Sequence, residues 1–204
     1  MNVIFHVGLH KTGTTFLQKE VFPNIKGINY NIYNPNLEYS LKKNETYLFS
    51  REGFSGLPLA SVNLNALDRD LIAYGISKKF PKAKIILGMR GKKGWLKSLY
   101  NLYVKGGGYL SYDDWFEKID KRYLDFDGYI DLLNELFDEV FIYKLEDLKN
   151  TNKKCVKSIC DFIGCEVPKY RNQTHNKSWK SWKMCVGKVR GFFIRNSRIF
   201  LDEI

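Results

Sequence analysis

The sequence predicts an α/β protein of three layers, in which a mostly parallel central sheet lies between two layers of helices. Short apolar runs that suit buried strands alternate along the chain with longer stretches of helical periodicity. The chain opens on one such run, residues 3–7, which passes through a glycine-containing loop directly into a helical stretch. With 204 residues, 44% of them hydrophobic, the chain can bury a sizeable core, so we expect one domain over residues 1–204.

The loop after the first predicted strand has the chemistry of an anion site. Gly8 and Gly13 permit backbone angles that other residues avoid, and Thr14 and Thr15 can cap the helix that follows. Backbone N–H groups and the positive end of a helix dipole then point to one place. The polar side chains of the loop add donors and charge: Lys11, Thr12, Thr14 and Thr15. We expect a phosphate group there, the plain alternative being a capped helix after a glycine turn.

The same loop differs from the phosphate loop of nucleoside triphosphatases. That pattern, G-x-x-x-x-G-K followed by Ser or Thr, has its lysine where this chain has Thr14, and Lys11 lies inside the loop instead. The standard lysine serves the β- and γ-phosphates and the next residue holds magnesium. The loop is therefore better suited to a diphosphate-like group that needs no metal, although an ATP-dependent nucleotide kinase with a variant loop stays an alternative.

Residues 11–15, Lys-Thr-Gly-Thr-Thr, resemble the 5′-phosphosulfate loop of the sulfotransferases that use 3′-phosphoadenosine 5′-phosphosulfate (PAPS). In that family the loop reads Lys, Ser or Thr, Gly, Thr, then Ser or Thr, between a first strand and a helix. The resemblance implies a P-loop-like α/β/α fold, PAPS as sulfuryl donor, adenosine 3′,5′-diphosphate (PAP) as product, and no metal. It also implies that Lys11, Thr12, Gly13, Thr14 and Thr15 bind the donor and that Lys11 is catalytic.

A second anion site is expected beyond the apolar strand at residues 83–89. Arg90 follows that strand, where a triphosphatase would have an aspartate for magnesium. Ser98 comes eight residues later, in a predicted helix over residues 95–103. The family binds the 3′-phosphate of PAPS with an arginine and a serine at this spacing, so the resemblance assigns Arg90 and Ser98 to that phosphate.

An acceptor hydroxyl also needs a base, and Glu52 is the first candidate. Residues 46–50 predict a short strand, which places Glu52 at the same edge of the sheet as Lys11. Residues 50–53, Ser-Arg-Glu-Gly, resemble the carbohydrate-type and bacterial-type enzymes that use a glutamate base. We expect partial desolvation to raise the pKa of Glu52 towards the working pH, whereas an ion pair with a basic neighbour is the ordinary alternative.

The histidines are the other candidate bases. His6 lies inside the first predicted strand and should be buried, and His175 lies in the tail without a matched motif. His10 either shapes the phosphate loop or contacts substrate, and its closeness to Lys11 disfavours its protonated form.

The remaining elements should form scaffold. Residues 106–108 are three glycines, which serve either as a hinge for a lid or as a helix C-cap. The acids of residues 143–148 either belong to a loose family motif or cap the next helix. The other expected elements are a short strand over 27–33, helices over 65–80, 129–137 and 152–163, a helix opening at 111–114, a strand over 139–143 and a basic helix over 184–201.

Four cysteines lie in the last quarter of the chain, at spacings unlike those of zinc modules. They are Cys155, Cys160, Cys165 and Cys185. We expect reduced thiols, with Cys155 and Cys160 packed on one helix.

The formal charge is +11, and residues 169–204 form a basic C-terminal segment. Nine Lys or Arg residues and no acids lie between residues 169 and 198, which favours polyanionic partners. A non-enzymatic polyanion-binding module is thus a further alternative, but no nucleic-acid motif is present and we expect no nucleic-acid partner. The preferred acceptor is a carbohydrate or a lipid-linked saccharide, with peripheral membrane contact through the tail. No run of eighteen apolar residues or signal-like N-terminus is present, so we expect a cytoplasmic location.

Overall fold

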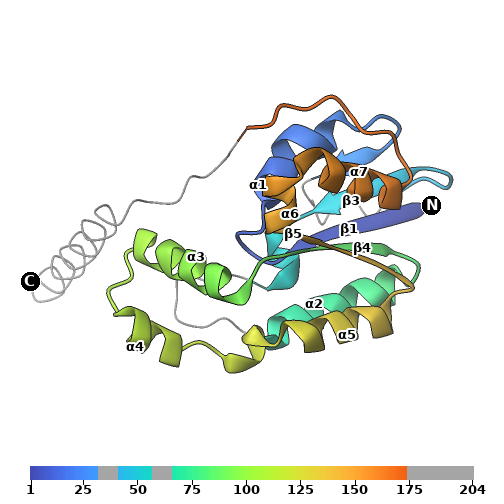
Figure 1. The fold of residues 1–204 in the computed structure, drawn as a ribbon. Coiled ribbons are helices and arrows are strands. Elements are labelled where there is room, and N and C mark those ends of the chain that lie inside the picture. The colour runs from blue at the N-terminus through green and yellow to red at the C-terminus, as the bar shows by residue number, and fades with distance from the viewer. Residues whose placement is uncertain (32–40, 57–65, 174–204) are drawn as a thin grey trace, which may run out of the picture.

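The structure, a computed structural model, describes residues 1–31, 41–56 and 66–173. Five parallel strands form one sheet in the order β2-β3-β1-β4-β5 (Figure 1). Their bounds are Asn2–Gly8 for β1, Asn29–Asn31 for β2, Thr46–Ser50 for β3, Lys84–Met89 for β4 and Glu139–Lys144 for β5. The α/β fold predicted from the sequence is confirmed.

Helices cover both faces of the sheet, because alternate side chains of each strand point to opposite faces. On β1, Val3 and Phe5 belong to one buried cluster, whereas Ile4 belongs to another. Helices α2 and α5 lie on the first face and α1, α6 and α7 on the second (Figure 1). Their bounds are Ala66–Lys79 for α2, Phe126–Leu136 for α5, Thr14–Phe16 for α1, Leu145–Asn150 for α6 and Asn152–Ile163 for α7.

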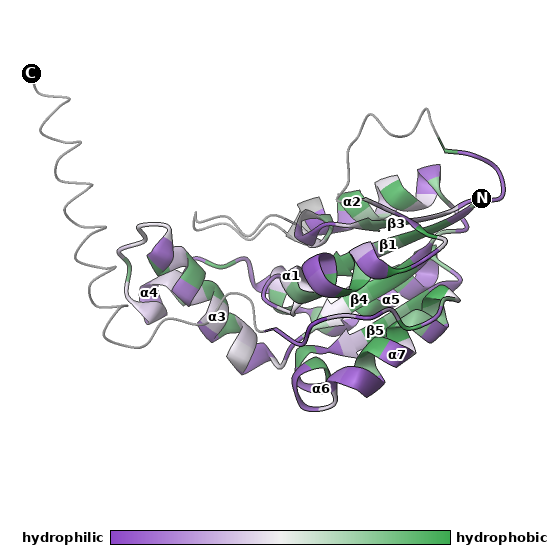
Figure 2. Cartoon of the chain, turned by 90° about the horizontal axis from the view of Figure 1, so that it is seen from above, coloured by the Kyte–Doolittle hydropathy of each residue, from purple (hydrophilic) through white to green (hydrophobic). Residues whose placement is uncertain are grey.

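Helices α3 (Lys92–Lys105) and α4 (Tyr112–Glu117) extend past the edge where the strands end (Figure 2). The Ser111 hydroxyl caps α4 by accepting the N–H of Asp114 at 3.1 Å, as its position in the sequence predicts. Between the two helices, Gly107 has a φ of 93°. The Tyr103 hydroxyl accepts the N–H groups of Tyr109 and Leu110 at 3.1 and 3.2 Å. The triple glycine thus serves as a C-cap, while its use as a lid hinge stays a prediction.

The segment after the phosphate loop is helical as far as Asn24, but it is not one regular helix. It passes from α1 into a π-helical segment, η1 (Leu17–Val21), and then into a 3₁₀ turn, η2 (Phe22–Asn24). A sequence reading that assumes one helical period cannot distinguish these forms. Pro23 lies inside η2, in its first turn, where its missing N–H costs little.

Two other elements differ from expectation. The strand predicted over 27–33 is β2, three residues long within the described chain. The acids Glu146 and Asp147 lie in the first turn of α6, a helix that the sequence did not predict, and therefore do not cap α7. Helix α7 has the predicted bounds, and it buries Cys155 and Cys160 as free thiols. Cys185 and the helix expected over 184–201 lie outside the described residues.

In the described ranges, no helix is both long enough and apolar enough to cross a membrane. The same ranges hold no cluster of three or more His, Cys, Asp or Glu side chains that could bind a metal ion.

Candidate active site

The loop that follows β1 has the shape of an anion site. Lys11 and Gly13 both adopt left-handed backbone angles, with φ of 67° and 93°. Within the described chain, no acceptor receives the N–H groups of Lys11, Thr12, Gly13 or Thr14. Gly13 stands at the N-cap of α1 without a side-chain cap, so the expectation that threonines cap this helix is wrong. Thr12 Oγ1 instead donates to the carbonyl of Leu9 at 2.5 Å and closes the loop.

Gly13 is required by packing as well as by its φ. A Cβ on this residue would lie 2.7 Å from Leu148 Cδ2 and 3.2 Å from Leu145 Cδ1. Both leucines are buried in α6, so they have little room to move. Helix α6 thus fixes the back of the phosphate loop against the body of the protein.

A polar floor lies beneath the loop. His6 of β1 is fully buried, with Nδ1 2.7 Å from Ser50 Oγ and Nε2 3.1 Å from the Tyr143 hydroxyl. Burial lowers the pKa of His6 to about 3, against a smaller opposing effect of Glu52. Tyr143 reaches this position across β4 because Gly88 has no side chain: a Cβ there would lie 2.6 Å from the tyrosine Cζ. Burial raises the pKa of Tyr143, so its hydroxyl keeps its proton.

Thr14 is the loop residue whose hydroxyl group lacks a well-formed hydrogen bond within the described residues. Its Oγ1 is buried and makes no well-formed hydrogen bond in the described part of the chain, although it lies near the Tyr143 hydroxyl. A buried oxygen of this kind needs a partner. Together with the four N–H groups it fits a bound phosphate, which supplies acceptor oxygens to all of them.

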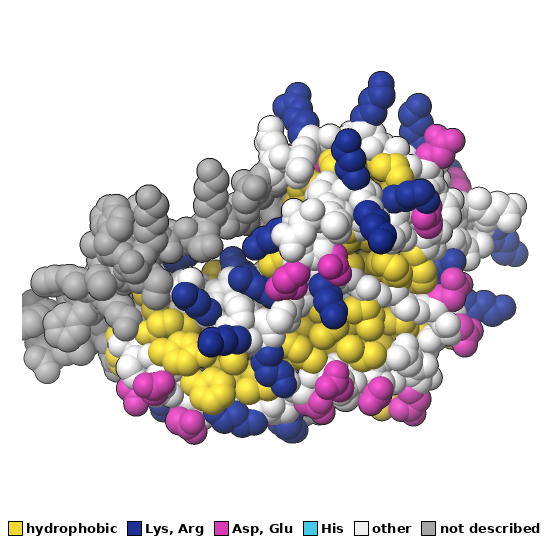
Figure 3. Space-filling view, viewed as in Figure 1, with side chains coloured by type: hydrophobic (Ala, Val, Ile, Leu, Met, Phe, Trp, Pro, Cys, Tyr) yellow, Lys and Arg dark blue, Asp and Glu magenta, His cyan; other side chains and the backbone are white. Residues whose placement is uncertain are grey.

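Arg90 directly follows β4, as predicted, and its guanidinium lies beside Gly94 in the first turn of α3, since a Cβ on Gly94 would lie 3.2 Å from Arg90 Nε. Ser98 lies two turns into α3 and is half-buried. In the ranges that the structure describes, neither Arg90 nor Ser98 has a hydrogen-bond or ion-pair partner. Figure 3 shows Lys and Arg side chains gathered on the surface around α3.

Lys11 lies within electrostatic reach of this second group. Burial lowers the pKa of Lys11, the charge of Glu52 opposes that change, and the charges of Lys105 and Arg90 add to it. The strand-end arginine, the loop lysine and the glutamate after β3 therefore share one electrostatic environment. The structure brings together these three predicted residues, which are far apart in the sequence.

Glu52 opens the 3₁₀ turn η4 (Glu52–Ser55) directly after β3. Its Oε2 lies 3.1 Å from His10 Nδ1, and the side chains are 35% and 4% exposed. Burial raises the pKa of Glu52, but the hydrogen bond and charge of His10, followed by the charges of Lys11 and His6, outweigh it and lower the pKa. The expectation of a raised pKa is thus wrong, because Glu52 meets three nitrogen bases at this edge of the sheet. The alternative stated from the sequence, an ion pair between Glu52 and a basic neighbour, agrees with the contact between Glu52 and His10.

Three polar residues of this region were not predicted from the sequence: Ser50 as a partner of His6, Tyr143, and Ser55. Strand register brings Ser50 and Tyr143 to His6, and the turn η4 brings Ser55 to the carbonyl of Gly8, 47 residues away. His175, the third candidate base, lies outside the described residues.

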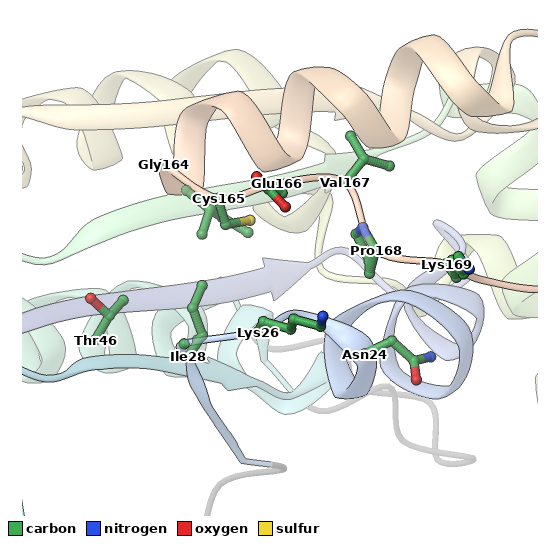
Figure 4. A pocket seen from close by; sticks show the side chains of 12 residues that line it. Asn24, Lys26, Ile28, Thr46, Gly164, Cys165, Glu166, Val167, Pro168 and Lys169 are labelled. Carbon is green, nitrogen blue, oxygen red and sulfur yellow. The ribbon is translucent and has the colours of Figure 1, made fainter.

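A groove among the described residues lies elsewhere (Figure 4). It runs between the segment around Lys26 and the chain that leaves α7 at Gly164, and it reaches Thr46 at the start of β3. None of the predicted site residues lines it.

A parallel sheet with a glycine-containing loop after its central strand β1, and an arginine after the neighbouring strand β4, is typical of α/β proteins of the P-loop-like type. The chain belongs to the sulfotransferase family, since the model of the sulfotransferase domain matches residues 2–190. Sulfuryl transfer is therefore its activity, and the family uses PAPS.

Solved structures with the same fold agree. A sulfotransferase from Alicyclobacillus acidocaldarius matches with a TM-score of 0.60 and 14% identity, over 86% of this chain and 87% of that one. The mouse sulfotransferase SULT7A1 complexed with PAP matches with a TM-score of 0.55 and 18% identity, over 93% of this chain and 64% of the mouse chain. No curated protein matches the sequence.

Proposed function

We propose that this protein transfers the sulfuryl group of PAPS to a hydroxyl of a carbohydrate or glycoconjugate and releases PAP. The observation that carries the proposal is the loop of residues 11–14, whose four backbone N–H groups and Thr14 hydroxyl have no acceptor or well-formed partner within the described chain. Hydrogen-bonding groups without partners destabilise the folded state, and a bound anion removes this cost by accepting their hydrogen bonds.

The donor is held at two places in this proposal. Residues 11–15 hold its 5′-phosphate through N–H groups and threonine hydroxyls, an arrangement preorganised for negative charge. Arg90 and Ser98 hold the 3′-phosphate, where the arginine makes charge-assisted hydrogen bonds. Their lack of partners in the described chain supports this role. Bound PAPS supplies a sulfuryl group on a phosphate leaving group.

Lys11 and Glu52 carry the chemistry in this proposal. Lys11 neutralises negative charge that gathers on the leaving phosphate oxygen as the bond to sulfur lengthens. Glu52, ionised because its pKa is lowered, accepts the proton of the acceptor hydroxyl. A base of low pKa is a weaker proton acceptor, so correct placement has to provide part of its effect.

The carbohydrate acceptor rests on two supports. Glu52 follows the strand β3 in the arrangement that resembles carbohydrate-type enzymes. The basic segment of residues 169–204 adds positive charge that suits an acidic glycan or the anionic membrane around a lipid-linked saccharide. Both observations are consistent with a cytoplasmic enzyme in peripheral contact with a membrane.

Calorimetry tests donor binding. We expect PAP to bind without magnesium, and Lys11→Ala and Arg90→Ala to weaken that binding, while Lys154→Ala on the exposed side of α7 leaves it unchanged. Binding of ATP that requires magnesium, without binding of PAP, would contradict the proposal and favour a kinase.

The acceptor is tested by transfer of labelled sulfuryl groups from PAPS to panels of glycans, phenols and amines. Transfer to a sugar hydroxyl is the expected result. Transfer to a phenol and to no sugar would overturn the carbohydrate proposal and leave the sulfotransferase activity intact.

A further inference from the structure

Both ring nitrogens of His10 are engaged by oxygen atoms of the segment that follows β3. Nδ1 lies 3.1 Å from Glu52 Oε2, and Nε2 lies 2.9 Å from the carbonyl oxygen of Gly56. The His10 side chain is 4% exposed, so its ring is shielded from solvent, while the Glu52 carboxylate is 35% exposed. His10 is therefore held at both ends by residues more than 40 positions away in the chain.

The hydrogen count of these contacts decides what His10 can do. A backbone carbonyl only accepts, so Nε2 must carry a hydrogen. The single proton between Nδ1 and Oε2 then joins the imidazole to the carboxyl group, and no ring nitrogen is left to take a proton from a substrate. His10 cannot act as the base while it keeps both contacts.

The turn that carries the Gly56 carbonyl, the hydrogen-bond acceptor of His10 Nε2, is itself held in place. Ser55 Oγ donates to the carbonyl of Gly8 at 2.7 Å and lies 2.9 Å from the carbonyl oxygen of Glu52, which holds η4 against the end of β1. From the other side, the buried Tyr123 hydroxyl donates to the carbonyl of Ser55. Tyr123 stacks on Trp95, with ring centroids 5.7 Å apart. The Gly56 carbonyl thus belongs to a turn held by two buried hydroxyl groups.

We infer that His10 is a positioning residue: anchored on the Gly56 carbonyl, it holds Oε2 of Glu52, so that Oε1 is presented to the acceptor hydroxyl. This inference rests on the proposed role of Glu52 as base. In the reaction, the acceptor oxygen gives its proton to Glu52 Oε1 and forms a bond to sulfur. The bond from sulfur to the donor phosphate oxygen breaks, and its electron pair stays on that oxygen.

Among the described residues, the charged and titratable groups that act on the Glu52 carboxylate come from two elements. His10 and Lys11 lie in the loop after β1, and His6 lies within β1 itself. Of these three, only His10 has a hydrogen bond to the Glu52 carboxylate among the described residues. His10 is accordingly the group whose removal changes both the direction of the carboxylate and its ionisation.

Two substitutions separate the two contacts of His10. In His10→Asn the amide nitrogen takes about the place of Nδ1, so it can donate to Glu52 but cannot reach Gly56. In His10→Gln the amide nitrogen takes about the place of Nε2, so it keeps the Gly56 contact and loses Glu52. The variants carry the same uncharged amide group and differ by one methylene group, and each leaves one of the two contacts.

We expect kcat of His10→Gln to fall about 10- to 100-fold, the usual cost of a misplaced catalytic group, and kcat of His10→Asn to stay at least about threefold higher than that of His10→Gln. The KM for PAPS and the calorimetric affinity for PAP should change little in either variant. The acid limb of the pH profile of kcat should move to higher pH in His10→Gln, because Glu52 loses the hydrogen bond and charge that lower its pKa.

Equal losses in His10→Asn and His10→Gln, or a His10→Gln enzyme with the kcat and pH profile of the wild type, would overturn the positioning role. A Glu52→Gln enzyme with unchanged turnover removes the proposed base itself. A Glu52→Gln enzyme that binds PAP but does not turn over, beside an unaffected His10→Gln enzyme, leaves the proposed function standing and refutes only the inference.

Discussion

Replacing His6 with glutamine should make the stability of the protein less sensitive to acid. His6 is fully buried between Ser50 and Tyr143, and its pKa falls from 6.5 to about 3 on folding. Between these two values the unfolded chain binds a proton that the folded chain does not bind, so the free energy of unfolding decreases as the pH falls. From about pH 7.5 to about pH 5 the loss from His6 alone is about 2 kcal/mol, at about 1.4 kcal/mol for each pH unit below the unfolded value.

The assay is urea unfolding of the wild type and of His6→Gln at both pH values. His6→Gln is less stable at neutral pH, because it loses the ring contacts, but its own decrease between the two pH values should be smaller by about 2 kcal/mol. Other titrating groups contribute equally to both proteins and cancel in this difference. Parallel decreases in the two proteins would refute the reasoning, since they would show that His6 takes up its proton in the folded state.

Three further substitutions probe the proposed site. Lys11→Ala should lower kcat about 100- to 1000-fold, as the loss of an oxyanion-stabilising group does, with Lys154→Ala as the control in steady-state transfer assays. Arg90→Ala should weaken PAP binding about 10- to 150-fold in calorimetry, because the arginine binds the 3′-phosphate. The affinity for adenosine 5′-monophosphate, which lacks that phosphate, should stay almost unchanged. Equal losses for both nucleotides would argue against this assignment. Gly13→Ala should cost about 2–4 kcal/mol in urea unfolding, from its positive φ and the collision with Leu148, and a change below about 0.5 kcal/mol would contradict both contributions.

The parts of the site that are local in sequence could be predicted. Residues 8–15 contain the glycines, threonines and lysine of the loop in one run, and Arg90 follows an apolar strand that is easy to recognise. The central sheet was equally accessible, because strands buried on both faces read as continuous apolar runs. Helix α7 has the predicted bounds for a related reason: its apolar positions repeat with a clear helical period.

The parts that depend on strand register could not be predicted. His10 and Glu52 are 42 residues apart, and His6 and Tyr143 are 137 residues apart. The sequence around each residue therefore does not predict its partner. The lowered pKa of Glu52 follows from this, because desolvation could be foreseen from a crevice position whereas the facing His10 and Lys11 could not be weighed against it. Helix α6 was missed for another reason: with six residues it is too short to show a helical period.

The left-handed backbone of Lys11 has a consequence for attempts to stabilise this protein. A non-glycine residue at φ 67° costs roughly 1 kcal/mol, and glycine at the same place would relieve that cost. A search guided by thermal stability alone would therefore favour replacement of Lys11 by glycine. Such a search would delete the ammonium group that we propose for catalysis and would report the loss as an improvement. Directed evolution of this protein should select for sulfuryl transfer and heat resistance together, with residue 11 kept as lysine.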